Sequence, residues 1–114
     1  MAGWSFTITR QPPEDYPRWL DRDAMLASWT VGAAGIRWID RLVEQGEAES
    51  LQRGGYPNLY TAPARVIVPL LASGEPPSDE VVRMFQPREI SIRQDELDRC
   101  APDQALTIVV WDQS

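Results

Sequence analysis

The segment that most constrains the fold is residues 105–111, near the end of the chain. Its pattern predicts a strand. Its side chains alternate between two faces, with Leu106, Ile108 and Val110 on one and Thr107, Val109 and Trp111 on the other. Apolar residues on both faces are typical of a central strand that is covered on both sides. The rest of the chain must therefore supply both neighbouring strands and packing layers for this segment.

A second alternating segment lies at the other end of the chain, over residues 3–10. Trp4, Phe6 and Ile8 share one face there, which indicates a half-buried strand with its aromatic side on the core. Residues 88–93 alternate as well, so we expect Ile90 and Ile92 to point inward and this strand to pair with the one at Leu106. Because strands at both termini need a common sheet, we expect the first and last strands to lie together.

The middle of the chain is expected to be mainly helical. The clearest helix covers about 33–45, where Ile36, Ile39, Leu42 and Val43 recur at spacings of three and four. Gly46 is suited to end it, since glycine adopts positive φ easily. The fold class predicted is α+β, a single domain over 1–114 with the terminal strands in one mainly antiparallel sheet and the helices packed on it.

Several other segments carry weaker patterns. Short helices are expected over 22–29 and 47–53, another from Ser78 to a stop at Pro87, and a loop over 54–60. Residues 62–72 favour a helix capped by Thr61, but Pro69 would interrupt it, so a strand remains the alternative there.

Composition and charge exclude several classes of protein. The chain has 114 residues, 43% of them hydrophobic and 25% charged, which is the balance of a globular domain. Its formal charge of −6 argues against a nucleic-acid binder, because phosphate would be repelled. With one cysteine, no recognisable leader at the N-terminus and no apolar run of membrane length, the sequence predicts a cytoplasmic protein with no membrane association.

No catalytic or metal-binding motif is visible. The chain has no histidine, which removes most triads, general bases and zinc sites. Asp95, Glu96 and Asp98 lack the alternating ligands and central glycine of a calcium loop. Cys100 has no recognisable base beside it, so an incidental thiol is the simpler interpretation. We therefore expect no enzymatic activity, no catalytic residues, no cofactor and no metal.

An acidic cluster surrounds the end of the predicted main helix, formed by Asp40, Glu44, Glu47 and Glu49. Carboxylates near a helix C-terminus oppose its dipole, so their presence there is consistent with a field that attracts a basic partner. The loop that follows carries Tyr56 and Tyr60. These two side chains either pack inward or offer a contact surface to the same partner.

The stretches WTVGAAGIRWIDRLVEQGEAESL and GGYPNLYTAPA, within an acidic, histidine-free domain, resemble bacterial immunity proteins. These proteins neutralise toxins of contact-dependent growth inhibition and related polymorphic toxin systems. The resemblance implies a cytoplasmic protein that binds a cognate toxin, often a basic nuclease, and blocks its active site. Such families share no common fold or binding residues, so the resemblance assigns no position in this chain.

Two hypotheses follow. The first is an immunity protein that occludes a basic toxin domain, with Asp40, Glu44, Glu47, Glu49, Tyr56 and Tyr60 as the expected partner-binding residues. The alternative is a small, non-enzymatic structural or regulatory subunit of a bacterial complex, which would bind through an apolar face. The sequence does not fix the oligomeric state under either hypothesis.

Overall fold

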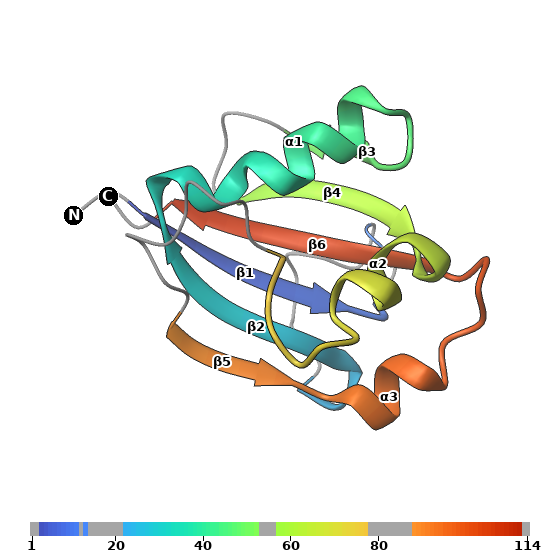
Figure 1. Cartoon of the computed structure of the whole chain (residues 1–114). Helices are drawn as coiled ribbons and strands as arrows, with labels where there is room; N and C mark the ends of the chain where they lie inside the picture. Colours follow the sequence, from blue (N-terminus) through green and yellow to red (C-terminus); the bar gives the residue numbers. More distant parts are fainter. Residues whose placement is uncertain (1–2, 12, 14–21, 53–56, 78–87, 113–114) are drawn as a thin grey trace.

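The computed structural model describes residues 3–11, 13, 22–52, 57–77 and 88–112. Six strands form one antiparallel sheet in the order β3-β4-β6-β1-β2-β5. The strands are β1 (Gly3–Thr9), β2 (Met25–Gly32), β3 (Glu49–Gln52), β4 (Asn58–Pro63), β5 (Arg88–Ile92) and β6 (Ala105–Asp112). The helices are α1 (Arg37–Glu44), α2 (Ala64–Leu70) and α3 (Gln94–Asp98), with 3-10 turns at Arg22–Ala24 and Ala33–Ile36. Figure 1 shows α1 and α2 on the same face of the sheet, so the α+β fold expected from the sequence is confirmed.

The last strand occupies the centre of this sheet, as its two apolar faces predicted. β6 lies between β4 and β1, and all five residues over 106–110 are buried. Its pairing with β1 runs without a shift from Trp4 opposite Asp112 to Thr9 opposite Thr107. The first and last strands therefore do lie together.

The face covered by the helices holds an aromatic layer. Phe6 stacks on Trp29 with 5.1 Å between ring centroids. Trp38 of α1 lies 5.5 Å from the first ring and 6.1 Å from the second. Phe6 and Trp29 face each other across the β1–β2 pair, so α1 closes directly over an aromatic pair supplied by two adjacent strands. Each such contact adds about 0.5–1.5 kcal/mol beyond simple area burial.

Buried polar groups hold the end of β1 to its neighbours. Thr9 Oγ1 donates to Ala24 O at 3.2 Å and accepts from Gln11 N at 3.1 Å. Thr107 Oγ1 donates to Gln11 O at 2.6 Å. A buried hydroxyl without a hydrogen-bond partner is costly, so these bonds stabilise the fold. They hold Gln11 between the end of β1 and Thr107 of β6.

The helix expected over 22–29 is wrong, because most of this segment belongs to β2. A one-residue shift in its pairing with β1 places Leu26 as an extra residue between Ala27 and Met25. Leu26 and Ala27 are therefore both buried, at 1% and 2% exposure. Two consecutive buried residues break the alternation of a strand and imitate the spacing of a helix.

The predicted short helix over 47–53 and the predicted loop over 54–60 each contain a strand instead, and residues 53–56 lie outside the described part of the chain. Residues 49–52 form β3 and residues 58–63 form β4, which together make an antiparallel hairpin. Leu59, Tyr60 and Ala62 of β4 are buried, and β6 pairs along the whole length of β4. The sequence over 54–60 is rich in glycine and proline, and this obscured a strand that tertiary pairing stabilises.

The remaining predictions have mixed outcomes. The helices at 33–45 and 62–72 are present as the turn at Ala33–Ile36 with α1, and as α2 with Pro69 inside it. Thr61 does not cap α2, because the residue before the helix is Pro63 and no side-chain cap forms. The strand over 88–93 is present as β5, but it pairs with β2 rather than with β6, and Ile90 is 45% exposed. The helix predicted from Ser78 lies outside the described residues.

Candidate functional site

The end of α1 positions the first part of an acidic surface. Gly46 has φ +77°, and its N–H donates to Val43 O at 3.1 Å, while Glu47 N–H donates to Leu42 O at 2.9 Å. These two bonds form a Schellman motif, which satisfies carbonyls that a helix end would otherwise leave open. The motif fixes where Glu47 leaves the helix and where β3 begins.

A second segment, residues 102–104, lies near the end of α1 although it is far from it in the sequence. Residues 102–104 lie against the start of α2, where Ala64 N–H donates to Gln104 O at 2.8 Å and Arg65 N–H donates to Pro102 O at 2.9 Å. These carbonyls satisfy amides of the first helical turn, for which no capping side chain is present. They also hold Asp103 beside the end of β4.

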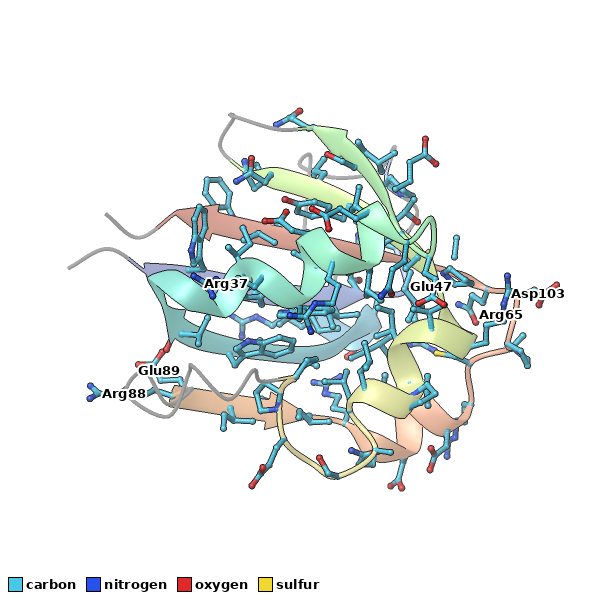
Figure 2. All side chains as sticks on the ribbon, turned by 45° about the horizontal axis from the view of Figure 1, so that its top comes forward. Arg37, Glu47, Arg65, Arg88, Glu89 and Asp103 are labelled. Carbon is cyan, nitrogen blue, oxygen red and sulfur yellow. The ribbon has the colours of Figure 1, made fainter. Side chains whose placement is uncertain are left out.

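The two segments and the end of β4 line an open hollow of about 290 Å³ at this end of the sheet. Its lining combines small apolar residues with three carboxylates: Gly46, Glu47, Ala48, Glu49, Thr61, Ala62, Pro63, Asp103 and Ala105. Figure 2 shows Glu47, Asp103 and Arg65 at one end of the molecule, and Arg88 and Glu89 at the other. We call this feature the acidic hollow, and it includes Glu47, Glu49 and Asp103.

The carboxylates of the acidic hollow form no ion pair in the described part of the chain, although Arg65 lies at the same end of the molecule. No ion pair or side-chain hydrogen bond among those residues involves Glu47, Glu49, Asp103 or the nearby Glu44. All four side chains are exposed. Like charges held together around small apolar residues create a negative field that attracts a cation.

The charges near α3 are arranged differently. Glu96 lies between two arginines, with 3.5 Å from its Oε2 to Arg10 Nη1 and 3.4 Å from its Oε1 to Arg99 Nη1. Cys100 Sγ lies next to this group and donates to Glu96 O at 3.4 Å. Burial raises the pKa of the Cys100 thiol above its ordinary value; the Arg10 charge opposes this shift and the Glu96 charge adds to it. Glu96 is therefore paired within the chain.

The residues predicted to bind a partner are only partly brought together. Glu47 and Glu49 line the acidic hollow, and Glu44 is exposed at the last residue of α1. Asp40 is half-buried one turn earlier and does not line it. Tyr56 lies outside the described residues.

Tyr60, which was predicted to bind a partner, is buried instead. It lies in β4 opposite Ile108, on the face that the helices cover, and only 2% of it is exposed. Of the two interpretations open for this tyrosine, inward packing is the one observed. Its side chain belongs to the hydrophobic core rather than to a contact surface.

Asp103 is the residue that the sequence did not identify. It is more than fifty residues from Glu47 and Glu49, and it stands in a turn before β6 with no pattern of its own. Only the pairing of β4 with β6, with Pro63 opposite Ala105, brings this turn to the hollow. That pairing depended on recognising β4 as a strand.

In the part of the chain that the structure describes, no group of three or more His, Cys, Asp or Glu side chains is arranged to hold a metal ion. The helices described here also include none with the length and apolar character needed to cross a membrane. Comparison with known protein families, with curated proteins and with solved structures finds no match to this chain.

Proposed function

We propose that this chain is an immunity protein, which binds and neutralises a basic bacterial toxin domain in the cytoplasm by covering its active site. The observation that supports this most is the acidic hollow. It gathers Glu47, Glu49 and Asp103 from two separate segments, and none of them forms an ion pair with a described residue. A basic partner would supply ion-pair partners for these carboxylates.

The form of the hollow fits a side chain better than a free small molecule. A small-molecule site buries most of its ligand, whereas this hollow, of about 290 Å³, is open to solvent. Arginine and lysine place an apolar stem on apolar surface and keep the charged group at the polar rim. Ala48, Ala62 and Pro63 offer such a surface, and the carboxylates offer the rim.

The test reverses charge at the hollow. In cells that express the product of the neighbouring gene, the wild-type chain should prevent toxicity and form a complex with that product. The Glu47→Lys/Glu49→Lys variant should bind at least about tenfold more weakly, since close charge pairs across an interface contribute about 1.5–7 kcal/mol. It should also protect poorly.

A matched control carries the same change of charge elsewhere. Asp95 and Asp98 are exposed on α3, which follows the opposite edge strand. Asp95→Lys/Asp98→Lys should bind almost as tightly as the wild type. Equal loss in both variants would show that only net charge matters, and no loss in either would remove the acidic hollow from the interface.

The alternative, a structural or regulatory subunit that binds through an apolar face, predicts a different response to salt. A complex that depends on the acidic hollow weakens as ionic strength rises, because screening reduces the attraction. An apolar interface would be almost insensitive to salt. Titration of the complex from low to high salt therefore separates the two functions.

A further inference from the structure

Both outer strands of the sheet present an edge with an exposed apolar side chain. Among the described strands, β3 pairs only with β4, and β5 pairs only with β2. Leu51 of β3 is 41% exposed and Ile90 of β5 is 45% exposed. An edge strand offers unpaired N–H and C=O groups to any other strand, including one from another copy of the chain.

Each of these edge strands contains one residue more than its partner. In β5, Arg88 faces Thr30 and Ser91 faces Ser28, so Glu89 and Ile90 together lie opposite a single residue of β2. In β3, Ser50 faces Tyr60 and Gln52 faces Leu59, so Leu51 has no residue of its own opposite. Inside the sheet, β6 pairs with β1 and with β4 without a shift, whereas β2 carries one extra residue, Leu26, opposite β1.

The bulge in β5 is maintained against a local conformational preference. Glu89 has φ +53°, and it is the one residue other than glycine with positive φ among those described. Bulges of this kind usually place glycine at that position, because side chains with a Cβ avoid it. The chain keeps the extra residue there although the position does not suit glutamate.

We propose that the extra residues of β3 and β5 keep the two edges of this sheet from pairing with another copy of the chain. A bulge bends its strand, increases the local twist and takes the outward N–H and C=O groups out of line. The edge strands are also short, at four and five residues, which limits the ladder that a second copy could form. This inference does not depend on the proposed function.

Deleting Glu89 tests the proposal, since it restores one-to-one pairing between β5 and β2. The deletion chain should sediment faster as its concentration rises, while the wild type should sediment at one rate. Glu89→Gly is the matched control: it loses the same carboxylate but keeps the extra residue, so it should behave like the wild type. A folded deletion chain that stays monomeric like the control would overturn the proposal.

The second edge and the wild-type chain provide tests that do not rely on one variant. Deletion of Leu51, with Leu51→Ser as its control, should give the same contrast at β3. If neither deletion chain folds, amide exchange in the wild type decides. Exchange at residues 49–52 and 88–92 that does not change with concentration supports the proposal, and protection that grows with concentration contradicts it.

Discussion

The aromatic layer contains a residue of α1, and the acidic hollow begins just after the end of the same helix. The two regions differ in whether their side chains have partners among the described residues. Along its length, α1 places Trp38 against Phe6 and Trp29. At its end, it places Glu47 beside Glu49 and Asp103. The aromatic rings pack against one another, whereas the carboxylates form no ion pair with any described residue. Stability and binding should therefore depend on different residues, and substitutions should separate them.

The largest effect is expected from Trp29→Ala. Trp29 is 2% exposed and contacts both other rings of the layer, so its removal should lower the free energy of unfolding by about 3–5 kcal/mol. Trp111→Ala, at a tryptophan that is 36% exposed, should cost much less. Urea denaturation measures both values, and similar losses would break the distinction between the layer and the surface.

A smaller effect is expected where the two regions meet, at Gly46→Ala. Forcing alanine into φ +77° should cost about 1–2 kcal/mol, and it should also disturb the Schellman motif that positions Glu47. Gly74 provides the control, because it has φ +80° and, like Gly46, nothing within 4 Å of an added Cβ. Both variants should lose similar stability in urea. Only Gly46→Ala should also weaken binding of the partner.

A third prediction concerns the pH dependence of the Cys100 thiol, which lies next to the paired Glu96. Burial disfavours the Cys100 thiolate, so the pKa of this thiol is higher in the folded chain than in the unfolded chain. The resulting contribution to stability is complete below the pKa of the unfolded thiol and is lost as pH rises through the folded value. Alkylation rates should therefore rise at higher pH in the native chain than in urea. A native profile shifted to lower pH would contradict this.

The smallest change in stability is expected from Glu47→Lys/Glu49→Lys. Both side chains are exposed and carry no ion pair within the described residues, so unfolding free energy should change by no more than about 0.5 kcal/mol at each position. Urea denaturation should show this beside a clear loss of binding. A large loss of stability would mean that the hollow is a structural feature rather than a free surface.

The sequence predicted the fold where one pattern dominated a segment. The alternation of β1 and β6 and the helical spacing of α1 are each satisfied by the sheet and the layer on it. The predictions failed where pairing with distant strands decided the structure. Leu26 is buried only because β2 contains an extra residue opposite β1, and β3 has little apolar pattern because it lies at an edge.

The sequence predicted only those residues of the candidate site that lie close together in the chain. Glu47 and Glu49 follow one helix and could be grouped from the sequence. Asp103 joins them through the pairing of β4 with β6, which depends on a strand that was expected to be a loop. The burial of Tyr60 depends on the same pairing, so the sequence leaves both of its interpretations open.

The central claim is that the acidic hollow binds a basic partner, and affinity measured against ionic strength tests it most directly. The purified product of the neighbouring gene would be titrated with the wild type and with Glu47→Lys/Glu49→Lys from low to high salt. We expect tight wild-type binding that weakens steeply with salt, and weak variant binding with a shallower dependence. Equal affinities and equal salt dependence for the two chains would contradict the claim.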